Sequence, residues 1–268
     1  MNLSFNHIIS PNLNFEDFFK QAYDLEIKNI EIRNDLPKLD FNQIDINEII
    51  DLKNKFKIEI ISINALQKFN IWNDERKKEL ISLCNIAQKI DCSGLVLCPL
   101  NNSEYLDKES RIKILKKSLQ EINPILSDYN IKGFVEPLGF KSCSLRYKSE
   151  VINVLNFFNN DHMFSLVHDT FHHVVAQEES IFPNQTGIVH ISGVNKKDIK
   201  INDYTDELRE LINEEDKINN ITQINYFIEK GYSGIFSFEP FSSKIHNAAN
   251  SINLIKQSIN YINKNIIN

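Results

Sequence analysis

Short runs of apolar, mostly β-branched residues recur along the chain, and most precede a segment whose apolar positions return with the period of an α-helix. We expect strands at residues 3–7, 29–33, 58–65, 94–99, 133–138, 164–169, 187–192 and 234–240. A short turn is expected after the sixth run, and Asp74 is expected to cap the helix that follows the third. Strands that alternate with helices in this way indicate a parallel sheet.

Eight such units fill the 268 residues without a linker-like stretch between them. This length and this repeat predict an α/β fold, a single closed (β/α)8 TIM barrel over residues 1–268. The alternative is an open, doubly wound sheet, which usually carries a glycine-rich phosphate-binding turn after its first strand. The segment "FNHIISPN", residues 5–12, contains no glycine, and this favours the closed barrel.

Ionisable residues stand at the ends of four consecutive predicted strands. They are Glu136, Asp169, His190 and Glu239. The carboxyl ends of the strands form one rim in a barrel of this kind, and chemistry is located there, so we expect the four side chains to share one arc. Carboxylates with one imidazole suit a divalent cation such as Mn²⁺, Mg²⁺, Co²⁺ or Zn²⁺. The pattern therefore predicts one metal ion with coordination positions left open for a substrate.

Each of these residues taken alone also has a purely structural interpretation. Glu136 could cap a strand end, and His190 could be a hydrogen-bonded core histidine. Glu239 in "FSFEPF" is harder to explain in this way, because an unpaired carboxylate among phenylalanines costs several kcal/mol. The joint occurrence at four strand ends supports the metal site, and no single member does.

The stretch "FSLVHDTFHHVV", residues 164–175, contains three imidazoles and one carboxylate. Strand alternation places Asp169 on the inner face and His168 on the outer one. His168 is therefore expected to pack against the flanking layer or to face solvent. His172 follows where the chain can turn over the rim, so we expect it to contact substrate or to surround the metal ligands. His173 is expected to be structural or exposed.

Composition narrows the function classes. The net charge is −6, from 36 acidic and 30 basic side chains with no basic block, which disfavours nucleic acid as a partner. Apolar runs are too short to span a membrane, and "MNLSFNHIIS" does not have the pattern of a secretory signal. The cysteines form no CxxC pair, so we expect them to be reduced and buried, as in a cytoplasmic protein. They are Cys84, Cys92, Cys98 and Cys143.

The motifs "IEIRNDLP", "VEPLGFKSCSLRYKSE", "LVHDTFHH" and "GIFSFEPF" resemble the xylose isomerase-like barrel superfamily of sugar isomerases, epimerases and AP endonucleases. Within it the chain is most similar, over nearly its whole length, to the inosose isomerases of inositol catabolism. The metal ligands of the superfamily match the four residues at the strand ends. The loop after the seventh strand departs from the superfamily because residues 203–220 contain no glycine. The contacts of that loop cannot be transferred, and Arg209 is a candidate to replace some of them.

The resemblance implies a metal-dependent isomerase that converts 2-keto-myo-inositol to a 1-keto-D-chiro-inositol through an enediolate. Glu136 and Glu239 would be the catalytic pair that moves the proton, as in related epimerases. The residues expected to bind the substrate are His172, Arg33, Asn64 and Arg146. The aromatic residues that could form an apolar wall for it, or else pack in the core, are Phe69, Trp72 and Phe241.

Other functions stay open at this point. An inosose dehydratase, a ketose 3-epimerase or a hydroxypyruvate isomerase could begin with the same proton abstraction, so the ligands do not separate them. An AP endonuclease needs several metal ions and a basic DNA-binding face, which the acidic composition disfavours. A non-catalytic, metal-dependent polyol-binding protein would bind its ligand without exchanging a carbon-bound proton. A homodimer is compatible with the sequence.

Overall fold

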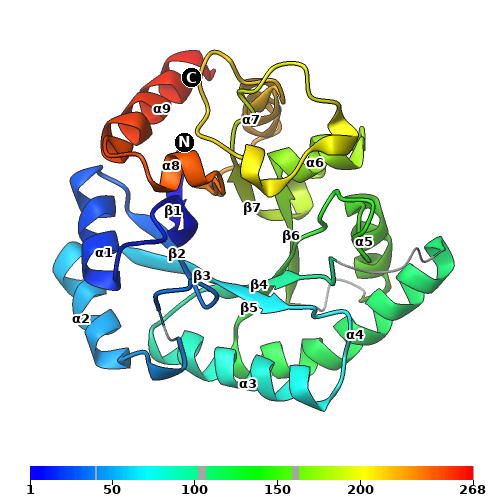
Figure 1. The fold of residues 1–268 in the computed structure, drawn as a ribbon. Coiled ribbons are helices and arrows are strands. Elements are labelled where there is room, and N and C mark those ends of the chain that lie inside the picture. The colour runs from blue at the N-terminus through cyan, green and yellow to red at the C-terminus, as the bar shows by residue number, and fades with distance from the viewer. Residues whose placement is uncertain (40, 102–106, 159–162, 268) are drawn as a thin grey trace.

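The computed structural model of the chain describes residues 1–39, 41–101, 107–158 and 163–267. Eight parallel strands close into one barrel in sequence order, and β8 pairs with β1 (Figure 1). The strands are β1 (Asn2–Asn6), β2 (Asn29–Arg33), β3 (Glu59–Gln67), β4 (Gly94–Cys98), β5 (Lys132–Val135), β6 (Phe164–Asp169), β7 (Thr186–Ile191) and β8 (Ile235–Phe238). The predicted closed barrel is confirmed.

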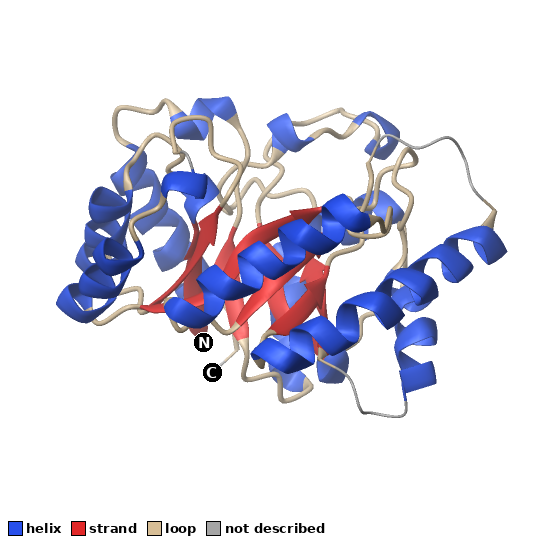
Figure 2. Ribbon diagram, turned by 90° about the horizontal axis from the view of Figure 1, so that it is seen from below, coloured by secondary structure: helices blue, strands red, loops and turns tan. Residues whose placement is uncertain are grey.

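Helices surround the barrel as an outer layer, as Figures 1 and 2 show from two directions. The helices are α1 (Phe15–Asp24), α2 (Ile46–Phe56), α3 (Asp74–Lys89), α4 (Lys108–Tyr129), α5 (Lys148–Leu155), α6 (Thr170–Ala176), α7 (Asn220–Glu229), α8 (Ser243–His246) and α9 (Ser251–Asn265). In the described part of the chain, none of them combines the length and the apolar composition that a bilayer crossing requires.

Two local predictions were wrong. The segment after β6 forms the helix α6 instead of a short turn, and the Asp169 side chain caps it by accepting from the backbone N–H of His172 at 2.8 Å. The cap of α3 is Asn73, whose side chain accepts from the backbone N–H of Arg76, and Asp74 is the first helical residue. Both polar residues could serve as a cap, and the position of the first helical turn decides between them.

The barrel interior is filled by side chains that point inward from successive strands. These are Ala65, Val96, Cys98, Phe134, Val167 and Ile188, which form one buried cluster. The Phe134 ring takes up the space beside two glycines: a Cβ at Gly94 would lie 2.4 Å from Phe134 Cε2, and one at Gly187 would lie 2.6 Å from its Cε1. A larger cluster fills the layer between strands and helices. The rim above this packed floor is the place left for polar groups.

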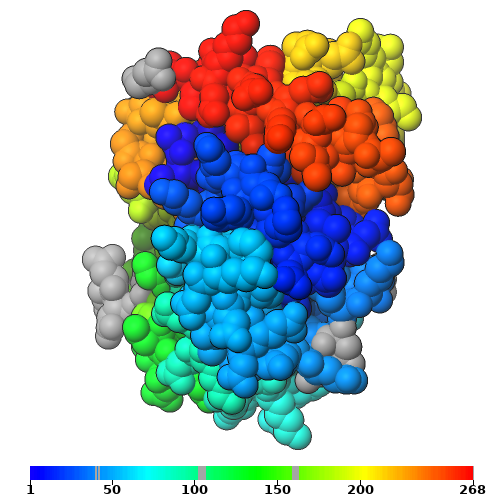
Figure 3. Space-filling view, turned by 90° about the vertical axis from the view of Figure 1, so that its left-hand side faces the viewer, coloured from blue at the N-terminus to red at the C-terminus, as the bar shows by residue number. Residues whose placement is uncertain are grey.

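Residues near both ends of the chain lie at the amino-terminal end of the barrel, opposite to the rim. Met1 and Ile267 line the same pocket there, and Figure 2 shows both termini on that side. On the face in Figure 3, α9, α1 and α2 follow one another down the molecule. The side chains that carry chemistry therefore have to be sought at the opposite, carboxyl end of the strands.

Candidate functional site

The four predicted metal ligands converge at the carboxyl end of the barrel. Glu136 follows β5, Asp169 ends β6, His190 lies in β7 and Glu239 follows β8. All four are buried, and each offers one ligand atom such that these atoms lie within 4.8 Å of one another. Parallel strands in consecutive order bring these residues together, although Glu136 and Glu239 are 103 residues apart in the sequence. The arrangement can hold one divalent cation.

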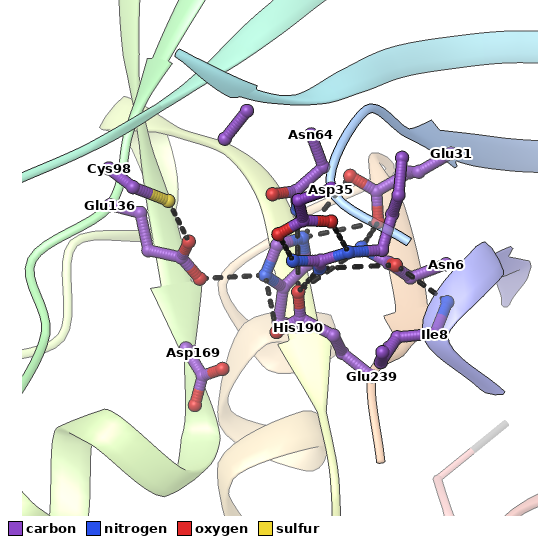
Figure 4. A network of polar contacts seen from close by, with 12 residues as sticks. Asn6, Ile8, Glu31, Asp35, Asn64, Cys98, Glu136, Asp169, His190 and Glu239 are labelled. Carbon is purple, nitrogen blue, oxygen red and sulfur yellow. Dashed lines mark hydrogen bonds and ion pairs between the residues drawn. The ribbon is translucent and has the colours of Figure 1, made fainter. Parts of the chain in front are cut away.

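His190 lies at the centre of this group. Its Nδ1 is 2.8 Å from Glu136 Oε1 and 3.2 Å from Glu239 Oε2, and its Nε2 is 3.1 Å from Glu31 Oε1 (Figure 4). Burial alone would lower the pKa of His190, but Glu239, Glu31 and Glu136 together raise that pKa well above its ordinary value. Binding of a cation to the ring would therefore release a proton.

Two buried arginines compensate the negative charge of the carboxylates. Arg209 Nη2 lies 2.5 Å from Asp169 Oδ2 and 2.7 Å from Glu239 Oε2. Arg33 Nη1 lies 3.1 Å from Glu239 Oε1. Burial tends to raise the pKa of Glu239, but His190, Arg209 and Arg33 outweigh it and hold that pKa well below the usual range. Glu239 is therefore a carboxylate in a dense network of cationic and hydrogen-bonding partners.

A cavity of about 210 Å³ opens beside this group. Its lining residues are Arg33, Asp35, Asn64, Gln67, Cys98, Glu136, Leu138, Phe140, His172, Asp206, Arg209, Glu239 and Phe241. The volume is smaller than the roughly 300–1,000 Å³ of sites that take drug-sized ligands. Most of its lining residues are polar or charged, so the cavity suits a small hydrophilic molecule.

The structure brings three of the four expected substrate-binding residues to this cavity. Arg33, Asn64 and His172 line it, and Asn64 also donates to Glu239 Oε1 at 3.3 Å. Arg146 is not among the lining residues. Its guanidinium donates to the backbone carbonyls of Gly139 at 2.7 Å and Val175 at 3.1 Å, and it thereby ties the loop after β5 to α6.

Of the three aromatic residues expected to form a wall for the substrate, one lines the cavity and two pack in the core. Phe241 lines the cavity, with its ring centroid 4.6 Å from Arg209 Cζ. Phe69 is fully buried in the larger core cluster, and Trp72 packs against that cluster. Phe140, which sequence reasoning did not single out, lines the cavity and packs edge-on against His172 at 5.1 Å. The apolar part of the lining therefore comes from Phe241 and from the loop after β5.

The remaining histidines of the stretch after Leu166 have structural contacts. His168 is fully buried on the outer face of β6, where its Nε2 lies 2.9 Å from Gln223 Oε1 of α7. The expectation that it packs against the flanking layer is confirmed. His173 Nδ1 lies 2.7 Å from Lys148 Nζ. Burial lowers the pKa of His173 to about 4 and that of Lys148 to about 8, so this pair holds α6 against α5 in the outer layer.

Several residues of the site were not assigned from the sequence. Glu31 and Cys98 were visible as residues of predicted strands, and the Cys98 thiol donates to Glu136 Oε2 at 3.3 Å. Phe140 lies in the irregular loop after β5, and Asp206 begins a 3-10 helix of three residues, so neither belongs to an element long enough to show a period. The four cysteines are free and buried, as expected. Burial and Glu136 raise the pKa of the Cys98 thiol well above its ordinary value, so the thiol is a donor in this site.

Known protein families and solved structures match the chain over most of its length. The model of a family described as xylose isomerase-like TIM barrel matches residues 19–265. An inosose isomerase of Halalkalibacterium halodurans is 26% identical over 203 residues, which are 71% of each chain. The crystal structure of a xylose isomerase domain-containing protein from Salmonella typhimurium LT2 matches with a TM-score of 0.86 at 31% identity, over 98% of this chain and 96% of that one. The structure of an IOLI protein with a bound zinc atom matches with a TM-score of 0.89 at 21% identity, over 99% of both chains.

Proposed function

Because the chain belongs to the xylose isomerase-like TIM barrel family, we propose that it is a metal-dependent isomerase that converts 2-keto-myo-inositol to a 1-keto-D-chiro-inositol. The observation that carries this proposal is the meeting of Glu136 and Glu239 with Asp169 and His190, with ligand atoms within 4.8 Å of one another at the barrel rim. The choice of a keto-inositol is supported by the inosose isomerases of Halalkalibacterium halodurans and Bacillus subtilis, at 26% and 24% identity.

The donor set fits a divalent cation. Three carboxylates and one imidazole, all buried, are ligands of the kind that Mn²⁺, Mg²⁺, Co²⁺ or Zn²⁺ accepts. When bound, such a cation polarises the substrate carbonyl and stabilises the negative charge of an enediolate. Buried carboxylates without such a cation depend on the neighbouring arginines for compensation, which explains the density of ion pairs around them.

Glu136 and Glu239 are the pair that moves the proton in this proposal. They come from opposite ends of the ligand arc, so one can remove a proton from carbon and the other can return one to the adjacent carbon. Among the described residues, Glu136 is contacted by the His190 ring and the Cys98 thiol. It keeps lone pairs for the substrate, whereas Glu239 accepts bonds from several donors. We therefore assign the first abstraction to Glu136.

His172 and Arg33 orient the substrate in this proposal. The Nδ1 atom of His172 is buried without a hydrogen-bond partner within the described parts of the chain, so a substrate hydroxyl can satisfy it. The guanidinium groups of Arg33 and Arg209 are already paired with Asp35 and Asp206. Because the positive charges of these arginines are already compensated by carboxylates, the cavity favours an uncharged polyol over a phosphorylated one.

Solvent exchange at carbon tests the proposal. The protein loaded with Zn²⁺ or Mn²⁺ is incubated with 2-keto-myo-inositol in D₂O, and NMR should show deuterium next to the carbonyl together with the isomeric ketone. A chelator should stop both. Glu136→Gln, which removes the base of the first abstraction, should abolish exchange, whereas Glu59→Gln, an exposed change at the start of β3, should not. Loss of water or epimerisation of a ketose instead would identify another enzyme of this scaffold, and binding without exchange would identify a polyol-binding protein.

The cellular setting forms part of the same proposal. Four free, buried cysteines agree with a reducing compartment such as the cytoplasm. A role in inositol catabolism follows from the proposed substrate. A homodimer is the assembly that we propose, and light scattering of the purified protein tests it.

A further inference from the structure

Glu31 is a charged residue to which the proposed reaction assigns no role. It lies in β2 with its side chain in the barrel interior, and it is 0% exposed. It is not among the residues that line the cavity, so a substrate there does not reach it. A carboxylate in such a place costs several kcal/mol unless its oxygens are hydrogen-bonded or paired.

Hydrogen bonds and an ion pair to neighbouring side chains satisfy this requirement at both oxygens of Glu31. Ser62 Oγ donates to Glu31 Oε2 at 2.6 Å, and Asn6 Nδ2 approaches Oε1 at 3.5 Å. The main partner is His190, whose Nε2 lies 3.1 Å from Oε1 and 3.2 Å from Oε2. Ser62 thus fixes the carboxylate from β3, and the carboxylate presents both oxygens to one ring nitrogen.

The other ring nitrogen of His190 faces the opposite way. Its Nδ1 lies among the candidate metal ligands, 2.8 Å from Glu136 Oε1 and 3.2 Å from Glu239 Oε2. Figure 4 shows the imidazole between Glu136 on one side and Glu31 on the other. The two nitrogens therefore have different surroundings, one inside the ligand group and one outside it.

We propose that Glu31 is the positioning residue of the metal centre: its carboxylate accepts the Nε2–H of His190 and thereby leaves Nδ1 as the nitrogen that binds the cation. This inference rests on the proposed metal-dependent function. A carboxylate behind a metal-binding imidazole fixes the tautomer and the ring orientation and makes the ligand nitrogen more basic.

A second buried histidine of the same barrel provides an internal comparison. His168 is also fully buried, and its Nε2 partner is the neutral amide oxygen of Gln223 at 2.9 Å. A neutral hydrogen-bond acceptor is therefore sufficient to hold a buried histidine that has only a structural role in this molecule. His190 instead has a carboxylate with its own hydroxyl anchor, and this arrangement is expected where the ring has to act as a strong ligand.

Metal affinity of the full chain tests the inference without an activity assay. Zn²⁺ binding is measured by competition with a chromophoric chelator for the unmodified protein and for Glu31→Gln, which keeps an acceptor but removes the charge. We expect the affinity of Glu31→Gln to fall by about 10- to 100-fold. Ser62→Ala keeps the charge and removes only the anchor, so a loss of less than about tenfold is expected. The control Glu59→Gln, at the exposed first residue of β3, should bind as the unmodified protein does.

The tautomer gives a second readout. In the Zn²⁺-loaded protein labelled with ¹⁵N-histidine, His190 should carry its proton on Nε2. A proton on Nδ1, or an unchanged Zn²⁺ affinity in both Glu31→Gln and Ser62→Ala while the unmodified protein binds the ion, would overturn the role of Glu31 and leave the proposed function intact. An unmodified protein that binds no divalent cation would overturn both.

Discussion

The guanidinium of Arg209 joins two of the four candidate metal ligands, because its Nη2 lies 2.5 Å from Asp169 Oδ2 and 2.7 Å from Glu239 Oε2. The residue comes from residues 203–220, the glycine-free segment of the loop after β7. The loop is held in place because the Arg209 carbonyl accepts the backbone N–H groups of Phe241 and Ser242, each at 2.9 Å. This segment thus places a cation directly on the buried carboxylates.

Replacing Arg209 by methionine should destabilise the protein by about 3–5 kcal/mol, because the buried carboxylates lose their counter-charge. A saturating divalent cation should recover a larger share of stability in Arg209→Met than it adds to the unmodified protein, since the cation supplies the missing positive charge. Thermal and denaturant unfolding with and without Zn²⁺ measure both effects.

The control for this prediction is Lys244→Met. Lys244 is 72% exposed and pairs with Glu210 at 2.9 Å, so its loss should change stability by less than about 1 kcal/mol. An Arg209→Met protein as stable as this control would show that Arg209 does not compensate the site.

Gly139 allows the loop after β5 to lie directly on α6. A Cβ there would be 2.2 Å from the backbone oxygen of His172 and 2.6 Å from the backbone nitrogen of Ala176. Backbone atoms cannot move aside as a flexible side chain can, so Gly139→Ala should cost about 1–3 kcal/mol of stability. It should also raise KM, because the displaced helix carries His172.

The matched control is Gly231→Asn. Gly231 has φ +78° and open space around its Cβ position, and asparagine tolerates this left-handed conformation. Gly231→Asn should lose no more than about 1 kcal/mol of stability, and its KM should not change. Equal losses in the two variants, measured by urea unfolding and steady-state kinetics, would contradict the role of the close contact at Gly139.

The barrel and the ligand group could be predicted because each depends on a regular period. Strand alternation determines that Asp169 points inward and His168 outward, and the closed order of parallel strands then brings Glu136 and Glu239 to the same rim. The helix α6 was missed because seven residues are too few to show a 3.6-residue period.

The remaining part of the site depends on the paths of loops and on side-chain directions. Arg146 and Arg209 both follow strands in the sequence, yet Arg146 donates to backbone carbonyls and Arg209 pairs with the carboxylates. Nothing in their sequence neighbourhoods distinguishes these outcomes. Glu31 lies in a predicted strand, but its role as a partner of His190 depends on the register between distant strands.

The stability of the fold should depend on pH through His7. Burial lowers the pKa of His7 from 6.5 to about 4, with a hydrogen bond from the ring to the Leu13 carbonyl opposing this shift and Arg33 adding to it. Between these two pH values the unfolded chain takes up a proton that the folded chain does not. The contribution of His7 to the free energy of unfolding is therefore fully present above pH 6.5. It is lost as the pH falls toward 4, by about 1.4 kcal/mol per pH unit.

His7→Gln removes this contribution. Urea unfolding at pH values from 7 to 4 should give a shallower dependence for His7→Gln than for the unmodified protein, whatever the absolute stabilities are. The other acid-sensitive groups are common to both proteins, so they cancel in the difference of slopes. Identical slopes would show that the pKa of His7 is the same in the folded and the unfolded chain, and would contradict this prediction.

Asp35 should control whether the cavity accepts anions. Arg33 donates to it through Nε at 2.8 Å and Nη2 at 2.7 Å, so the planar fork that would otherwise bind a phosphate or a carboxylate is occupied. Asp35→Asn removes the competing charge at a partly exposed position, and stability should change little. Inorganic phosphate, tested as an inhibitor at low ionic strength, should bind Asp35→Asn about tenfold more tightly than the unmodified protein. Asp51→Asn makes the same charge change on the exposed side of α2 and should leave phosphate binding unchanged, so an equal gain in both variants would mean that net charge, and not the freed fork of Arg33, admits the anion.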